Sequence, residues 1–139
     1  SAARAQVVGE RILPHLRKGA IVLCDRYADS TYAYQGYGLG LDLGVLRAIT
    51  EFATGGLVPD LTILLDVPVE VGLRRKAEEL GEAWDRLERR ARAFHERVRA
   101  GYHEMAAREP ARWLVLDATA PVADLQAAIR ERVMREIAA

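Results

Sequence analysis

Three short stretches of the chain are almost continuously apolar. They are residues 20–24, 61–66 and 113–117, with the sequences AIVLC, LTILLD and WLVLD. Strands that are buried on both faces by crossover helices have this pattern, and such strands belong to parallel sheets. Longer segments with apolar residues three or four positions apart lie between them, which is typical of amphipathic helices. The pattern therefore predicts an α/β fold in which helices flank a parallel sheet.

Helical spacing is expected in six segments. They cover residues 2–18, a short helix capped by Asp29 or Ser30, a helix capped by Asp42 and ended by Gly55-Gly56, a helix from residue 69, a long helix from residue 87 to 105, and a last helix from Pro121. Asp is a common N-cap and Gly a common helix terminator. In the helix after Asp42, Val45, Leu46, Ile49, Phe52 and Ala53 are expected to face inward.

Four glycines, at positions 36, 38, 40 and 44, follow the short helix. They come after a helix and not after a strand, and their spacing differs from the G-x-G-x-x-G pattern of dinucleotide-binding loops. They predict a flexible connection.

Asp25 and Arg26 follow the first apolar stretch directly. They are therefore expected at the carboxyl end of a strand, which is the edge where open α/β sheets bind ligands. A carboxylate there can hold a divalent metal through water, and a guanidinium can form two hydrogen bonds to phosphate oxygens. The pair indicates chemistry on a metal-bound phosphate.

The short helix after this pair carries Thr31, Tyr34 and Gln35 on one face, because helical residues three or four positions apart are neighbours. A carboxamide can pair with an N–H and a C=O together, and a phenol ring can press against a sugar. The face is suited to a pyrimidine nucleotide. An ordinary polar helix surface is the alternative.

Composition narrows the function further. The 139 residues carry 20 basic and 20 acidic side chains, and this balance argues against a protein that binds nucleic acid by bulk phosphate attraction. The chain is short enough for a single domain over 1–139. Without a long apolar run or a signal-peptide pattern, a cytoplasmic protein with no membrane association is expected.

The cysteine and the histidines, residue types that often bind metals or undergo redox chemistry, are interpreted as structural or solvated. The single cysteine, Cys24, lies in an apolar stretch and is expected to be a small buried residue. His15, His95 and His103 have no partner at metal-ligand spacing, so we expect them to be structural or solvated.

Two longer motifs resemble one family. The run DRYADSTYAYQG at 25–36 is similar to the nucleoside-monophosphate binding motif of thymidylate kinases, and PDLTILLDVPVEVGLRR at 59–75 resembles another segment of that family. The resemblance covers essentially the whole chain. It implies a nucleoside monophosphate kinase with a P-loop NTPase-like fold, a homodimer that transfers phosphate from ATP to dTMP with Mg²⁺, giving dTDP for dTTP biosynthesis.

The resemblance also implies roles for individual residues. Arg26 holds phosphate and is catalytic together with Arg86, which lies in a lid segment over residues 76–88, and Asp25 orients hydrated Mg²⁺. Acceptor-binding residues are implied to be Arg4, Arg26, Ser30, Thr31, Tyr34 and Gln35. Donor-nucleotide contacts are implied for Arg75, Arg86, Ala118 and Thr119.

The sequence departs from the family in two ways. The lid carries Glu78, Glu79 and Glu82 where relatives often have arginines, and the phosphate-loop motif G-x-x-x-x-G-K-[ST] does not occur in these 139 residues. We therefore expect that the N-terminal strand and the P-loop of the fold lie outside this sequence, and that these residues alone are inactive. Two alternatives stay open, namely a related deoxynucleoside or nucleoside monophosphate kinase, and a non-catalytic nucleotide-binding module.

Overall fold

The computed structural model describes residues 1–80 and 88–138. The chain divides into two compact units, Ser1–Val58 and Pro59–Ala139, and each is described by itself. The single domain expected over 1–139 stays a prediction.

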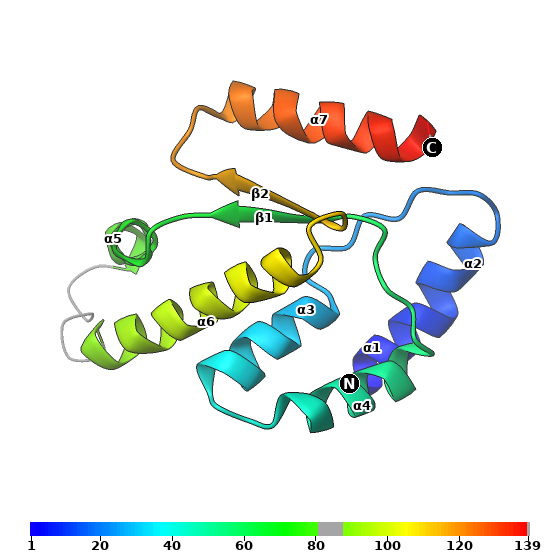
Figure 1. Cartoon of the computed structure of the whole chain (residues 1–139), viewed down its shortest axis with the longest axis horizontal. Helices are drawn as coiled ribbons and strands as arrows, with labels where there is room; N and C mark the ends of the chain where they lie inside the picture. The colour runs from blue at the N-terminus through cyan, green and yellow to red at the C-terminus, as the bar shows by residue number, and fades with distance from the viewer. Residues whose placement is uncertain (81–87, 139) are drawn as a thin grey trace. The chain divides into compact units, whose positions relative to one another are not determined.

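The first unit begins with the predicted helix of residues 2–18. It consists of α1 (Ala2–Val7), the π-helical η1 (Val8–Ile12) and α2 (Leu13–Leu16) in direct succession (Figure 1). The π-helical part directly precedes the turn containing Pro14, which has no N–H to donate to the preceding turn. Val8 and Ile12 are its buried side chains.

Residues 20–24 form no strand, and this corrects the first strand prediction. Ile21 is 73% and Leu23 is 93% exposed, and Cys24 is exposed and not buried as predicted. An extended segment becomes a strand only when a neighbour accepts and donates its backbone hydrogen bonds. Within the described residues the one sheet has two strands, and neither of them pairs with this segment.

The chain turns helical again immediately after Tyr27. Helix α3 (Ala28–Thr31) continues into the π-helical η2 (Tyr32–Gly38). Tyr27 is the N-cap residue, so the expected capping role of Asp29 or Ser30 is wrong, because both lie in the first turn. Gly36 and Gly38 are buried in η2 and not in a flexible connection. A Cβ atom on Gly36 would lie 2.3 Å from Leu43 Cδ2, so glycine allows the close approach of this helix to the next.

Helix α4 (Leu43–Thr54) begins and ends as predicted. Asp42 Oδ1 accepts a hydrogen bond from Val45 N at 2.8 Å, and Gly55 ends the helix with a φ of 62°. The expected inward face is wrong in part. Val45, Ile49 and Phe52 are 57%, 47% and 93% exposed. The buried residues of α4 are the small polar Thr50 and Thr54, so the helix face that carries these two threonines is the one that packs within the unit.

The second unit contains the sheet. Strands β1 (Thr62–Asp66) and β2 (Trp113–Asp117) pair in parallel, from Thr62 opposite Trp113 to Asp66 opposite Asp117. Both strand predictions and the parallel orientation are confirmed. The register places the two aspartates side by side at the carboxyl end of the sheet.

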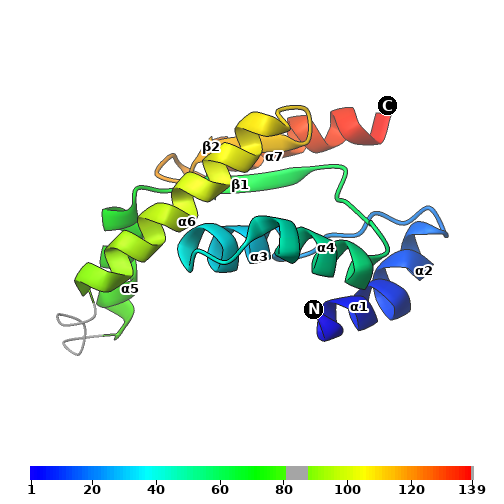
Figure 2. The ribbon, with the colours of Figure 1, turned by 60° about the horizontal axis from the view of Figure 1, so that its bottom comes forward.

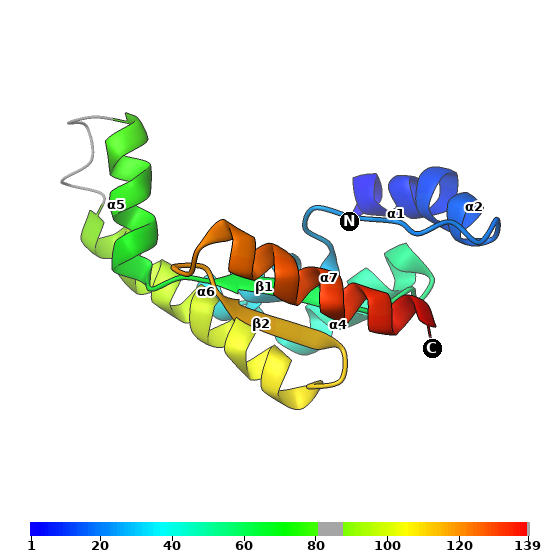
Figure 3. The ribbon, with the colours of Figure 1, turned by 90° about the horizontal axis from the view of Figure 1, so that it is seen from above.

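Within the described residues of this unit, three helices accompany these strands. They are α5 (Val69–Leu80), α6 (Glu88–Arg108) and α7 (Val122–Ala138). In Figure 1 the strands run between α7 and α6, while Figure 2 shows α5 beside α6 and Figure 3 shows α7 running along the strands. The buried apolar side chains described in this unit include Leu73, Val98, Met105 and Trp113. These elements agree with the predicted helices from residue 69, over 87–105 and after Pro121.

The lid predicted over 76–88 falls largely on residues whose structure is not described. Arg86 lies among residues 81–87, outside the described part of the chain. None of the helices described within 1–80 and 88–138 has the length and apolar character required to span a bilayer.

Candidate nucleotide site

The first cluster in the N-terminal unit joins α1 to α3. Arg4 Nη2 donates to Thr31 Oγ1 at 2.8 Å and approaches the carbonyl oxygen of Tyr27 at 3.4 Å. Arg4 Nη1 is buried and has no hydrogen-bond partner in the described part of the chain. A shielded guanidinium N–H without an acceptor is costly. The structure brings together two residues for which the family resemblance implied acceptor binding, and it leaves one donor unsatisfied there.

Arg26 forms a second cluster with the same helix. Its guanidinium Cζ lies 4.6 Å from the centroid of the Tyr34 ring, and its Nε donates to Ser30 Oγ at 3.4 Å. The distance to the ring is within the range of a cation–π contact. Arg26 is exposed, so its outer nitrogens can reach a ligand. The structure thus unites three of the predicted acceptor-site residues.

The backbone of Arg26 is in an unusual conformation. Its φ of 65° is the one positive value among the described residues other than glycine. A side chain in this left-handed region costs about 1 kcal/mol or more. Such strain persists where the surrounding structure fixes it, and here it belongs to the residue expected to hold phosphate.

The predicted metal residue, Asp25, is exposed beside Arg26. No three His, Cys, Asp or Glu side chains of residues 1–80 and 88–138 gather closely enough to hold a metal ion. Mg²⁺ in phosphate-transfer sites typically uses one or two carboxylates and completes its shell with water and phosphate oxygens. An exposed, single carboxylate beside an arginine fits that donor set.

Gln35, another predicted acceptor-site residue, is half-buried on η2.

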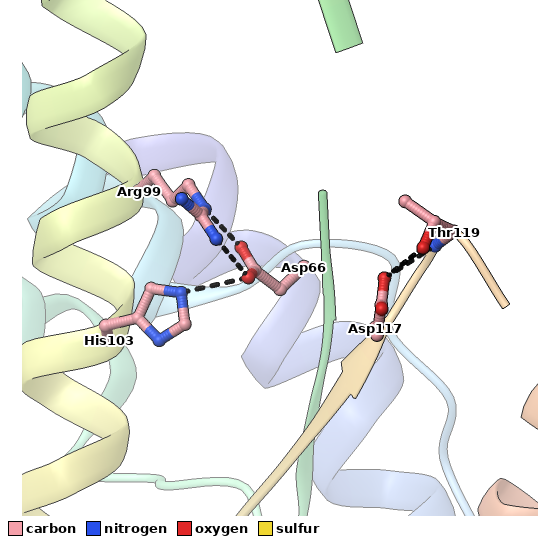
Figure 4. A network of polar contacts seen from close by, with 5 residues as sticks. All are labelled: Asp66, Arg99, His103, Asp117 and Thr119. Atoms are coloured by element: carbon pink, nitrogen blue, oxygen red, sulfur yellow. Dashed lines mark hydrogen bonds and ion pairs between the residues drawn. The ribbon is translucent and has the colours of Figure 1, made fainter. Parts of the chain in front are cut away.

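The carboxyl end of β1 in the second unit carries an ion pair that was not predicted (Figure 4). Asp66 accepts two hydrogen bonds of 2.7 Å from Nε and Nη2 of Arg99, and His103 Nε2 lies 3.1 Å from Asp66 Oδ2. Hydrogen bonding by Arg99 holds the pKa of Asp66 below its usual value. His103 is therefore structural, as expected, but with a carboxylate partner that helical spacing could not reveal.

Asp117 at the end of β2 shapes the predicted adenine-side turn. Its Oδ1 accepts from Thr119 N at 2.9 Å and from Thr119 Oγ1 at 2.7 Å, as Figure 4 shows. These bonds, the hydroxyl's first, keep the pKa of Asp117 below its usual value. Ala118 N donates to the carbonyl oxygen of Asp66 at 2.6 Å, which ties the turn to β1. Arg75, the other predicted donor-side residue, is exposed on α5.

The low pKa of Asp66 predicts acid sensitivity. The ion pair contributes its full stability above the unfolded-state pKa of about 3.9, and this contribution is lost as pH falls through the lower folded-state pKa. Because Arg99 is 41% exposed, solvent screening limits the contribution to about 1 kcal/mol. Asp66→Asn is expected to lower the free energy of unfolding by that amount at pH 7 and by almost nothing at pH 2, as measured by urea unfolding.

The exposed Asp60 in the same unit provides the matched control. Asp60→Asn is expected to change stability little at either pH. A loss for Asp66→Asn that stays constant from pH 7 to pH 2 contradicts the ion-pair account.

Known proteins resemble this chain over most of its length. The family model described as thymidylate kinase matches residues 1–129. A thymidylate kinase of Herpetosiphon aurantiacus is 55% identical over 85% of this chain and 60% of its own length. A thymidylate kinase of Thermomicrobium roseum is 56% identical over 97% of this chain and 65% of its own length. One of Deinococcus radiodurans is 54% identical over 93% of this chain and 62% of its own length. The chain therefore spans about 60% of the length of these relatives.

Proposed function

The chain belongs to the thymidylate kinase family, and from this premise we propose that its function is the transfer of the γ-phosphoryl group of Mg-ATP to dTMP, giving dTDP. Membership implies a P-loop NTPase-like fold, and the parallel β1–β2 pair with its helices agrees with it. The observation that most supports the proposal is the assembly of Arg4, Thr31, Arg26, Ser30 and Tyr34 around one short helix.

The acceptor side follows from the two clusters of the N-terminal unit. Arg4, Thr31 and Gln35 recognise thymine, because a guanidinium donates and a carboxamide both donates and accepts at a base edge. The unpaired Arg4 Nη1 is a donor for which a base carbonyl supplies the missing acceptor. Ser30 and Arg26 take the phosphate, and Tyr34 lies beneath the sugar.

The chemical step needs positioning and charge neutralisation more than a general base. The attacking phosphate of dTMP is already anionic, and charge spreads over the oxygens of the transferring group. Arg26 holds the acceptor phosphate in line and neutralises part of this charge. Asp25 holds the hydrated Mg²⁺, which neutralises phosphate charge when bound.

The donor side is proposed to use Arg75, Ala118 and Thr119 for the nucleotide of ATP. Arg86 of the lid contacts the transferring group. The 139 residues contain no phosphate-loop motif, and backbone N–H groups of such a loop normally cradle the phosphates. We therefore propose that these residues by themselves bind dTMP but transfer no phosphate.

Product analysis tests the proposed function. The full-length protein is incubated with radiolabelled ATP, Mg²⁺ and dTMP, dUMP, dCMP or thymidine in parallel, and products are separated by chromatography. Preferential formation of dTDP supports the proposal. A preference for thymidine or dCMP indicates a related kinase, whereas nucleotide binding without any transfer indicates a non-catalytic module.

Tyr34 is expected to set the preference for deoxyribose. Its ring is held against Arg26, and by this proposal it occupies the space that a 2′-hydroxyl needs. In the full-length protein, Tyr34→Ala is expected to lower the ratio of kcat/KM for dTMP over ribothymidine monophosphate by about tenfold, the scale of one modest steric or packing interaction. Tyr34→Phe keeps the ring and is expected to retain most of the preference. An unchanged ratio in Tyr34→Ala refutes this role.

A homodimer is the proposed assembly. The exposed apolar residues Val45, Ile49 and Phe52 of α4 support it, because contiguous apolar surface marks association sites. Sedimentation of the full-length protein should give a dimer, and Phe52→Glu should give a monomer. A monomeric wild-type protein contradicts the proposal.

A further inference from the structure

We propose that Tyr27 is a positioning residue that holds the Arg4 guanidinium in place for the base of the acceptor nucleotide. The inference rests on the proposed function of Arg4. It adds a role for Tyr27, which lies between Arg26 and α3 as the N-cap residue of that helix.

Tyr27 contacts Arg4 in two ways. Its carbonyl oxygen lies 3.4 Å from Arg4 Nη2, and its ring centroid lies 5.7 Å from Arg4 Cζ. Thr31 Oγ1 accepts from the same Nη2 at 2.8 Å. The guanidinium is therefore fixed by an aromatic ring and by two acceptors on α3 and its N-cap, a set that restricts both its place and its orientation.

The phenol group of Tyr27 anchors this arrangement. Its hydroxyl donates to the carbonyl oxygen of Leu57 at 3.2 Å. Burial raises the pKa of Tyr27, so the hydroxyl stays protonated and can donate throughout the neutral range. Leu57 lies just beyond the end of α4, shortly after the left-handed Gly55. Tyr27 thus links the arginine of α1 to the end of α4.

This linkage matters because an arginine side chain has many rotamers. A guanidinium that is already ordered loses less conformational freedom when it binds a base. Removing the ring should therefore loosen Arg4 and weaken dTMP binding, while the affinity for ATP should stay the same.

Nitrogen NMR relaxation of the arginine Nε–Hε groups tests the first step without a ligand. In the wild-type chain, Arg4 should be rigid, with an order parameter of about 0.8, and in Tyr27→Leu it should fall below about 0.6. The exposed Arg17 at the end of α2 gives the value of a mobile arginine. Tyr27→Phe removes only the anchor and should give an intermediate order parameter, so the test remains valid if the leucine variant does not fold.

Steady-state kinetics of the full-length protein test the second step. Tyr27→Leu is expected to raise KM for dTMP by about tenfold, a loss typical of one charged or cation–π contact. KM for ATP should be unchanged. The control for loss of a phenol hydroxyl is Tyr102→Phe in the second unit. This variant keeps the ring that packs on Trp113.

The outcomes separate this inference from the function on which it rests. Arg4 that stays rigid in Tyr27→Leu, or an unchanged KM for dTMP when Arg4 is mobile, overturns the role of Tyr27. A wild-type protein that does not bind dTMP contradicts the proposed function instead, and the relaxation data still decide whether Tyr27 holds Arg4.

Discussion

Replacing Arg26 by alanine is expected to lower kcat/KM for dTMP phosphorylation by about 10²- to 10³-fold. Hydrogen bonds from a charged donor contribute about 1.5–3 kcal/mol each, and Arg26 is proposed to make at least two to phosphate. The exposed guanidinium already rests on the Tyr34 ring, so the loss falls on phosphate contacts and not on the core. A coupled ADP-release assay with dTMP as acceptor measures the change.

Three further variants define the cause of that loss. Arg26→Lys keeps the charge but cannot form two parallel hydrogen bonds, so it should recover only part of the activity. Arg26→Gly should be as inactive as Arg26→Ala. Its free energy of unfolding should be about 1 kcal/mol higher than that of Arg26→Ala, because glycine adopts the φ of 65° without strain. Arg47→Ala, at an exposed position of α4, should leave activity unchanged. An Arg26→Ala protein with nearly full activity rules out the phosphate role.

Replacing Arg4 by methionine should weaken dTMP binding by about 10- to 100-fold. The side chain keeps a similar length but loses the donors that pair with Thr31 and, by proposal, with thymine, and a charged hydrogen bond contributes about 1.5–3 kcal/mol. The preference for dTMP over dCMP should fall along with it. Isothermal titration calorimetry with both nucleotides measures the two effects.

A double-mutant cycle shows whether Arg4 and Thr31 act together. Thr31→Ala removes the 2.8 Å hydrogen bond, and the double variant should lose less affinity than the sum of the single changes. Strictly additive losses would mean that the two side chains recognise the base independently. Equal weakening of dTMP and dCMP would show that Arg4 contributes affinity without base selectivity.

Sequence patterns predicted the elements that depend on local chemistry. The cap at Asp42, the helix end at Gly55 and the strand at 113–117 all follow from residue types and spacing. Continuous apolar residues also predicted a strand at 20–24, but strand formation depends on a partner that local sequence cannot specify. Ile21 and Leu23 are consequently exposed.

Sequence patterns could propose residues for the candidate site, but they could not predict the contacts between them. Helical spacing and the family motif indicated Thr31 and Tyr34, but the ring contact of Arg26 with Tyr34 depends on the left-handed turn at Arg26. The contacts of Tyr27 and His103 were not predicted for a related reason. Their partners, Leu57 and Asp66, lie 30 and 37 positions away along the sequence, beyond any helical or strand period.

The two neighbouring aspartates at the end of the sheet differ in how they would respond to ionic strength. Asp66 is paired with charged Arg99, whereas Asp117 is satisfied by the uncharged donors of Thr119. Dissolved ions screen attraction between partly exposed charges far more than they disturb neutral hydrogen bonds. Concentrated salt should therefore weaken the attachment of α6 to β1 through Asp66, while the Asp117–Thr119 turn keeps its shape. Two adjacent carboxylates at one sheet edge would then differ in their sensitivity to ionic strength.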